Sequence, residues 1–255
     1  MELSKELSDK RWRNIGLIVI ILEAIVLFIV CVSLTWLPPP ETDANEGLES
    51  HLSMLGWARM IEDPEVVDYV SRIGNNLVEN LPVRNQYPEF KYTFRVNNYA
   101  TVGANATKGG YVYISCGSLL EVRNEGELAS LLAHEIAHNA LRHQTRVDMS
   151  SSFEKIFFSD KDLIIEHEWE ADIFAARILL KSGYDPNDFA NILEREDALD
   201  PPEGGVYREH PPTVDRVFKI RQIAKRFKSK TSMENIMPLN RIKSLLGGCK
   251  DKNAK

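Results

Sequence analysis

The chain has few cysteines and no excess of positive charge. Three cysteines occur among 255 residues, Cys31, Cys116 and Cys249, and none forms a C-x-x-C pair, which excludes zinc ribbons and dithiol redox motifs. We expect Cys116 and Cys249 to be free thiols, with pairing in an oxidising compartment as the alternative. With 31 basic and 37 acidic residues, the net charge of −6 argues against a general nucleic-acid-binding surface. The patterns G-x-x-x-x-G-K and G-x-G-x-x-G are absent, so no nucleotide site is expected.

A long apolar run, residues 15–37, lies near the N-terminus and contains a single charge, Glu23. As a helix, this run would extend about 35 Å, which exceeds the roughly 30 Å of a membrane's hydrocarbon core. Its Ile, Leu, Val and Phe side chains contribute roughly −5 to −10 kcal/mol towards insertion, and one glutamate costs only about 3 kcal/mol. The run is too long for a cleaved signal peptide and ends without a small-x-small site. We therefore expect a retained transmembrane signal anchor.

The basic residues on either side of this run predict its orientation. Lys5, Lys10, Arg11 and Arg13 precede it, whereas residues 38–58 contain no lysine or arginine. The positive-inside rule therefore predicts that residues 1–14 are cytoplasmic and that residues 38–255 lie on the other side, the periplasm in a Gram-negative cell.

The rest of the chain divides by composition into three parts. Residues 38–50 begin with three prolines and are predicted to form a stiff, polar spacer, residues 51–228 a folded domain, and residues 229–255 a polar tail. Within the domain, apolar residues at helical spacing predict helices over 64–81, from Asn124 onward, and over 163–181, 186–199 and 213–227. Alternating patterns predict strands over 90–96 and 111–115. The expected fold class is α+β, mainly helical with a small sheet.

The sequence His134-Glu135-Ile136-Ala137-His138 lies on one of these predicted helices. Positions i and i+4 differ by about 40° around a helix, so both imidazoles project from the same face, as two ligands of a tetrahedral zinc ion must. Glu135 lies beside them, where it can take a proton from a zinc-bound water. Burying these side chains without a metal would cost several kcal/mol.

A third metal ligand is expected from the helix over residues 163–181. Glu168 and Asp172 share its apolar, inward stripe, whereas Glu166 and Glu170 lie on a polar stripe. We therefore assign Glu168 as the ligand and Asp172 as a residue that orients the site, with Glu170, Glu166 and His167 as alternatives for the ligand. Of the other histidines, His143 is expected at the surface or at a helix end, and His51 and His167 in solvent.

This combination, H-E-x-x-H followed by Glu168-x-x-Ala171-Asp172, resembles the HtpX-like zinc metallopeptidases, which include the CAAX prenyl proteases and the BepA-type periplasmic peptidases. The resemblance covers most of residues 60–225. It also includes the strand at 109–114, Ser182–Pro186, and His210-Pro211 with Arg216 after it. Gly103 and Lys108 replace an Asn and a Pro of the family pattern. A single predicted span distinguishes the chain from multispan members.

The resemblance implies a zincin-like domain of the gluzincin type that binds one Zn²⁺ through His134, His138 and Glu168. It also implies that Glu135 is the catalytic base, that His210 approaches the metal or stabilises the oxyanion, and that Arg216 lies near the site.

We expect a membrane-anchored endopeptidase that hydrolyses unfolded or misassembled polypeptides in protein quality control. Its predicted substrate-binding segment is the strand beginning at Gly110, in which Tyr111, Val112 and Tyr113 would pair with an extended peptide. The alternative is a zinc-containing chaperone or a latent, protease-like binding protein. Prenyl-peptide processing is not expected, because one span cannot build a chamber within the membrane.

Overall fold

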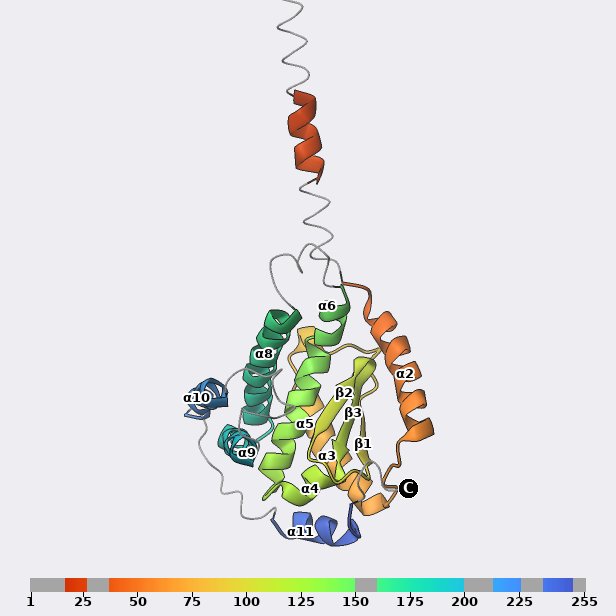
Figure 1. Cartoon of the computed structure of the whole chain (residues 1–255), viewed down its shortest axis with the longest axis vertical. Coiled ribbons are helices and arrows are strands. Elements are labelled where there is room, and N and C mark those ends of the chain that lie inside the picture. Colours follow the sequence, from red (N-terminus) through yellow and green to blue (C-terminus); the bar gives the residue numbers. More distant parts are fainter. Residues whose placement is uncertain (1–16, 27–36, 150–159, 200–212, 226–235, 250–255) are drawn as a thin grey trace, which may run out of the picture.

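The computed structural model describes residues 17–26, 37–149, 160–199, 213–225 and 236–249. The described residues form a mainly helical α+β domain with a small sheet, as predicted (Figure 1). The elements are α2 (Pro40–Trp57), α3 (Pro64–Glu79), β1 (Thr93–Asn97), β2 (Ala104–Thr107), β3 (Tyr111–Ser115), α4 (Cys116–Glu121), α5 (Glu125–Ala140), α6 (His143–Met149), α8 (Asp160–Lys181), α9 (Pro186–Leu199), α10 (Thr213–Ala224) and α11 (Ile236–Leu245). Two short 3₁₀ turns, η1 (Val83–Asn85) and η2 (Lys108–Gly110), complete the described elements.

The three described strands form one sheet in the order β1-β3-β2. β1 pairs with β3 in parallel, and β2 pairs with β3 in the antiparallel direction. β3 is therefore the central strand and has no free edge. The prediction that Gly110, Tyr111, Val112 and Tyr113 bind substrate by edge pairing is wrong. The backbone of Tyr111, Val112 and Tyr113 already pairs on both sides, and the N–H of Gly110 donates to the side chain of Asn139. The edge strands are β1 and β2, and the residues of β2, a strand not predicted from the sequence, line the cleft described below.

Helix α5 lies at the centre of the domain, between α8 and the sheet (Figure 1). It also contacts α3 and α9, so it is surrounded by apolar side chains along most of its length. Leu128, Leu132, Ile136 and Ala140 of α5 are fully buried. On the other face of the sheet, α2 packs against β2, β3 and η2. This central position fixes the residues of α5 rigidly.

Two side-chain hydrogen bonds cap the start of α5. The side-chain oxygen of Asn124 accepts the backbone N–H of Glu127 at 2.8 Å. The Glu127 carboxylate accepts the N–H of Arg123, the residue before the cap, at 2.8 Å. The first bond satisfies a backbone donor that the first turn leaves without a partner, and the second fixes the chain that enters the helix.

Residues 40–57 are helical, so the prediction of a stiff spacer over 38–50 is wrong. Pro40 lies in the first turn, where its missing N–H costs nothing. The buried Asp43 accepts a 2.7 Å hydrogen bond from Arg142, beyond the end of α5. Gly47 lies so close to the carbonyl oxygen of Lys108 that an added Cβ would be 1.9 Å from it. Helix α2 is thus an integral layer of the domain.

The C-terminal segment is also part of the fold. Leu239, Ile242 and Leu246 of the α11 region are buried, and Cys249 forms a disulfide with Cys116. The expectation of free thiols at these two cysteines is therefore wrong. The domain boundary predicted at residue 228 is also too early, since α11 packs against α3.

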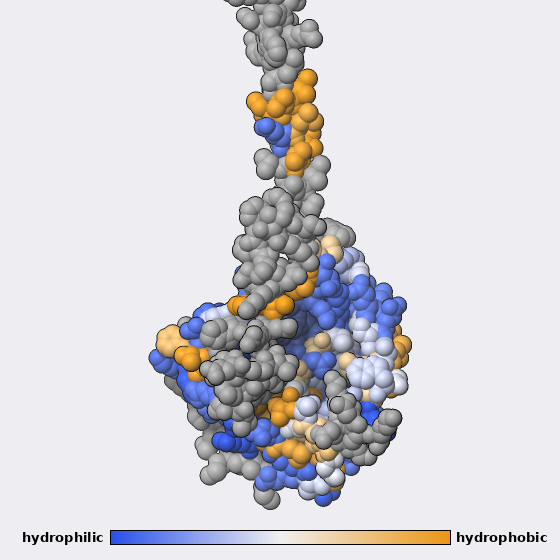
Figure 2. Space-filling model, viewed as in Figure 1, coloured by the Kyte–Doolittle hydropathy of each residue, from blue (hydrophilic) through white to orange (hydrophobic). Residues whose placement is uncertain are grey.

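Part of the predicted anchor is described. Residues 17–26 are helical, and their surface is apolar except at Glu23 (Figure 2). Among the described residues, no helix has both the length and the apolar character needed to cross a membrane. Residues 15–16 and 27–36 of the predicted span lie outside the described part, so the transmembrane helix stays a prediction.

Candidate metal centre

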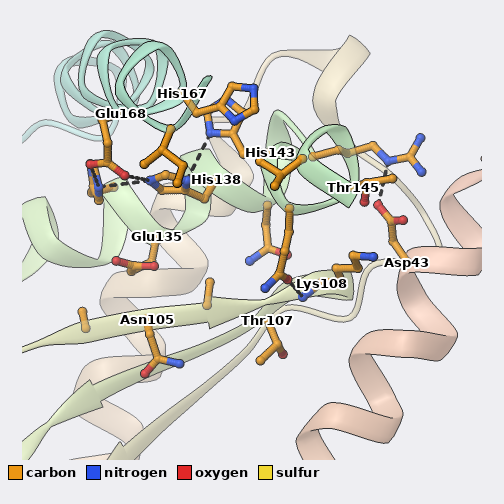
Figure 3. A pocket seen from close by; sticks show the side chains of 18 residues that line it. Asp43, Asn105, Thr107, Lys108, Glu135, His138, His143, Thr145, His167 and Glu168 are labelled. Carbon is orange, nitrogen blue, oxygen red and sulfur yellow. Dashed lines mark hydrogen bonds and ion pairs between the residues drawn. The ribbon is translucent and has the colours of Figure 1, made fainter. Parts of the chain in front are cut away.

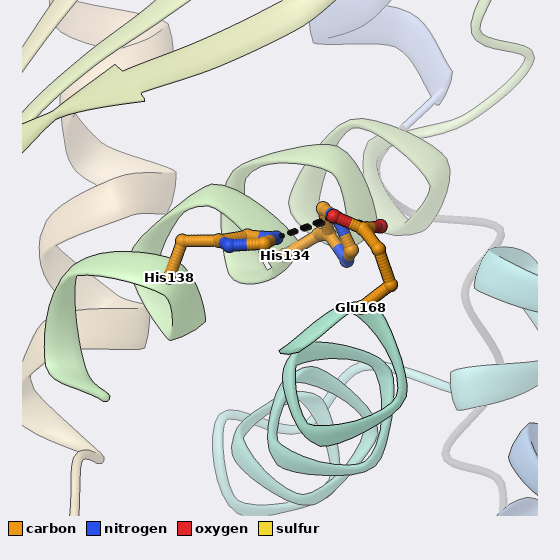
Figure 4. A group of neighbouring side chains, drawn as sticks. All are labelled: His134, His138 and Glu168. Atoms are coloured by element: carbon orange, nitrogen blue, oxygen red, sulfur yellow. Dashed lines mark hydrogen bonds and ion pairs between the residues drawn. The ribbon is translucent and has the colours of Figure 1, made fainter. Parts of the chain in front are cut away.

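Helices α5 and α8 bring three side chains to one point. His134 and His138 project from the same face of α5, and Glu168 faces them from α8 (Figure 4). The Nε2 atoms of the two histidines are 3.1 Å apart. The two oxygens of Glu168 lie 3.3 Å from Nε2 of His134 and 3.2 Å from Nε2 of His138. Three potential ligand atoms therefore converge from two helices.

These distances fit a tetrahedral metal ion. Two ligand atoms that each lie 2.0–2.1 Å from a zinc ion at the tetrahedral angle are about 3.3–3.4 Å apart. The three observed separations of 3.1–3.3 Å are close to this value. Two imidazoles and one carboxylate are also the donor set of a catalytic zinc site, which leaves a position for solvent. The residues therefore fit the metal that the motif implies.

A buried ion pair lies behind His134. Its Nδ1 is 3.2 Å from a carboxylate oxygen of Asp172, one turn after Glu168 on α8. Arg216 of α10 donates two hydrogen bonds to Asp172, at 2.7 and 2.8 Å, and lies 3.8 Å from Glu168. Asp172 and Arg216 are both almost fully buried. Asp172 and Arg216 therefore lie where the sequence analysis placed them, around the ligands.

The electrostatics of this group favour a cation. Burial opposes protonation of His134, but the carboxylates of Asp172 and Glu168 outweigh it and raise the pKa of the imidazole to about 10. Burial likewise disfavours the ionised form of Asp172, yet the bonds from Arg216 and the contact with His134 hold its pKa below the usual range. The site therefore stabilises positive charge at the point where a metal would bind.

The structure separates the acidic candidates on α8. Glu168 is 6% exposed and points towards the histidines, whereas Glu166 is exposed. Glu170 points away from the ligand cluster and forms an ion pair with Arg146 of α6. The inward stripe predicted for Glu168 and Asp172 thus has the expected orientation, because α8 is regular through this region.

Glu135 lines a cleft of about 480 Å³ beside the three ligand atoms. The opposite wall is formed by β2, and Glu135 projects from α5 towards that strand (Figure 3). The far end of the cleft is formed by Asp43 of α2 and by residues of α6. A half-buried carboxylate is thus placed next to the metal ligands in a cleft open to a substrate.

Three histidines outside the ligand set are buried. His51 and His167 were expected in solvent, whereas His143 lies at one of its two expected positions, a helix end, but is buried there. His143 is 3% exposed and contacts His138, His167 is buried against it, and His51 is buried with its ring 2.6 Å from the hydroxyl of Tyr113. The expected position of His143 assumed that α5 continues, but the helix ends at Ala140 and Arg142 adopts a φ of 55°. This turn redirects the chain and brings His143 back towards the site. Burial lowers the pKa of His143 to about 2, assisted by the charges of His138, His167 and Arg146.

His210 lies outside the described residues, so its predicted catalytic role stays a prediction.

Comparison with known proteins identifies the domain. Residues 66–160 match the model of peptidase family M48, a range that includes His134, Glu135 and His138. Over these residues the chain is similar to peptidase family M48. The resemblance to metallopeptidases predicted from the sequence motifs is thereby confirmed. Glu168 lies beyond the matched residues, and its place at the site comes from the geometry of α8.

Individual relatives agree with the family. The chain is 28% identical over 174 residues to the Beta-barrel assembly-enhancing protease of Yersinia pestis and 26% identical over 190 residues to that of Escherichia coli K12. These matches cover 56% and 62% of the chain but only 35% and 37% of the relatives. It is 25% identical over 179 residues to the Mitochondrial metalloendopeptidase OMA1 of Schizosaccharomyces pombe, covering 60% of the chain and 52% of that protein. The chain thus spans less than half the length of these bacterial relatives.

Proposed function

We propose that the chain is a membrane-anchored, zinc-dependent endopeptidase that cleaves unfolded or misassembled proteins, with Glu135 as its general base. The observation that carries this proposal is the convergence of His134, His138 and Glu168 beside Glu135, in a cleft with a strand edge along its wall. The match of residues 66–160 to family M48 supports the peptidase activity.

Each step of the proposed reaction uses a residue of this site. His134, His138 and Glu168 would hold the zinc ion, which would supply a Lewis acid for the scissile carbonyl and would lower the pKa of a bound water to about 7. Glu135 accepts a proton from the attacking water and delivers it to the leaving amine. Asp172 and Arg216 hold His134 in place, which keeps the ligand atoms in register with Glu135.

The edge of β2 determines which substrates are accepted. β2 pairs with β3 on one side, and its residues line the cleft opposite Glu135. The backbone of an extended peptide that pairs with this edge passes the metal ligands. Because main-chain hydrogen bonds then provide the affinity, recognition depends little on the peptide's side chains. A folded protein offers few such segments, which argues for unfolded or misassembled polypeptides as substrates. Two bacterial relatives carry the name Beta-barrel assembly-enhancing protease.

We also propose that residues 15–37 anchor the enzyme, with residues 1–14 in the cytoplasm and the peptidase domain on the other side of the membrane. The absence of lysine and arginine over residues 38–58 supports this orientation. The Cys116–Cys249 disulfide supports it independently, because disulfides persist in oxidising compartments such as the periplasm.

The test is cleavage of an unfolded protein by the purified full chain in detergent, with zinc present. We expect the wild type to cleave casein, and Glu135→Gln to retain one zinc ion while losing about 10²–10⁴-fold in rate. Glu166→Gln, an exposed carboxylate on α8, is the matched control and should cleave normally. A Glu135→Gln variant as active as the wild type would contradict the assigned base. A wild type that binds zinc without cleaving would favour the binding-protein alternative.

A further inference from the structure

The Nδ1 atoms of the two histidine ligands, which lie on the side of each ring away from the proposed metal, have different partners. Nδ1 of His134 faces a carboxylate directly, that of Asp172, at 3.2 Å. Nδ1 of His138 instead faces another imidazole, with 3.1 Å between it and Nδ1 of His143 (Figure 3). His143 is almost fully buried at the start of α6, and the proposed mechanism does not use it.

The second nitrogen of His143 also has a partner. Its Nε2 lies 3.2 Å from a carboxylate oxygen of Glu170 on α8, and Arg146 of α6 donates a hydrogen bond to the same oxygen. His167 stacks face to face on the His143 ring, with centroids 4.4 Å apart and planes within 5°. The Nε2 edge of the His143 ring and one of its faces are therefore held by side chains of α8.

The direction of the hydrogen bonds follows from the metal. When Nε2 of His138 binds an ion, its Nδ1 must carry the proton, so Nδ1 of His143 must accept. A neutral His143 then carries its own proton on Nε2 and donates it to Glu170. The opposite tautomer would place two N–H groups against each other at 3.1 Å and leave Glu170 facing a lone pair. Only the first arrangement of protons gives the facing ring nitrogens of His138 and His143, and the carboxylate of Glu170, hydrogen-bond partners of the right kind.

The use of an imidazole here also limits negative charge at the site. Glu168 and Asp172 already place two carboxylates at the ligand histidines, and Arg216 pairs with Asp172. A third carboxylate directly behind His138 would have to be desolvated in a buried region, which is costly for a charged group. His143 accepts the hydrogen bond of His138 without carrying a negative charge. The carboxylate of Glu170, on the far side of the His143 ring, lies nearer the surface, where it pairs with Arg146.

We propose that His143 is a positioning residue of the metal centre. It accepts the Nδ1–H of His138 and thereby turns Nε2 of His138 towards the ion, while Glu170 fixes the tautomer of His143. This inference rests on the proposed metal binding by His138.

The test measures the zinc dissociation constant of the purified full chain by competition with a chromophoric chelator. His143→Leu removes the acceptor and should weaken zinc binding about 10- to 100-fold. His143→Asn places an amide oxygen near the position of Nδ1 and should bind zinc nearly as tightly as the wild type. Glu166→Gln, which changes an exposed carboxylate on α8, is the control and should not change the affinity.

Two results would overturn the proposal. One is His143→Leu binding zinc as tightly as the wild type. The other is equal weakening by His143→Leu and His143→Asn, which would mean that packing matters and the accepted hydrogen bond does not. If His143→Leu does not fold, the zinc affinity of Glu170→Leu decides, because the Glu170 side chain is 41% exposed and its replacement is better tolerated. Weaker zinc binding by this variant supports the proposal that Glu170 fixes the tautomer of His143, and unchanged binding refutes it. A wild type that binds no zinc would instead show that the proposed function fails.

Discussion

The disulfide between Cys116 and Cys249 should contribute a large share of the stability of the domain. It closes a loop across a sequence separation of 133 residues. In the chain-entropy account, a crosslink of this separation destabilises the unfolded state by about 5 kcal/mol, although measured contributions are more often about 2–4 kcal/mol. The native state should change little, because Leu239 and Ile242 keep α11 buried against the domain without the bond.

Cys249→Ser is the appropriate perturbation because it removes the crosslink at the half-buried end and leaves the buried Cys116 in place. With a urea m-value of roughly 2.5 kcal/mol per molar, a loss of about 2–5 kcal/mol lowers the unfolding midpoint by about 1–2 M. Urea unfolding followed by circular dichroism measures this shift under oxidising conditions. In reductant, wild type and variant should coincide.

The reasoning fails if the two proteins unfold at the same midpoint without reductant. It also fails if their difference persists in reductant, since the loss would then come from contacts of the Cys249 side chain. Thiol titration of the denatured wild type provides an independent check, with one reactive cysteine expected before reduction and three after it.

Two further predictions concern the cleft and its support. Arg216→Met removes the cation that donates two hydrogen bonds to the buried Asp172 and should lower the unfolding free energy of the metal-free protein by about 3–5 kcal/mol, measured by urea unfolding; a loss below 1 kcal/mol would contradict the buried pair. Methylating the backbone nitrogens of a peptide substrate one at a time should lower kcat/KM at alternate positions only, because neighbouring residues of a strand direct their N–H groups to opposite sides. A scan without this two-residue period would exclude pairing with β2.

Helices α5 and α8 could be predicted from the sequence because their apolar residues follow the helical period and their ends carry local signals. The same period placed His134 and His138 on one face of α5, and Glu168 and Asp172 on one face of α8. These features depend on residues within a few turns of one another, which the sequence displays directly.

The features that were missed depend on contacts between distant residues. Helix α2 is held by Asp43, whose partner Arg142 is 99 residues away, and nothing near Pro40 distinguishes a helix start from a rigid spacer. β2 has the sequence Ala-Asn-Ala-Thr, which has no clear apolar alternation, so it became visible as a strand only through its pairing with β3. Strand order and the disulfide likewise follow from tertiary packing.

The central claim is that two histidines of α5 and one glutamate of α8 bind a single zinc ion. Metal analysis of the purified full chain tests it most directly, with Glu168→Ala and the exposed neighbour Glu166→Ala measured in parallel. The account predicts one zinc per chain in the wild type and in Glu166→Ala, and loss of zinc in Glu168→Ala. Full retention of zinc by Glu168→Ala, or a wild type that binds none, would contradict it.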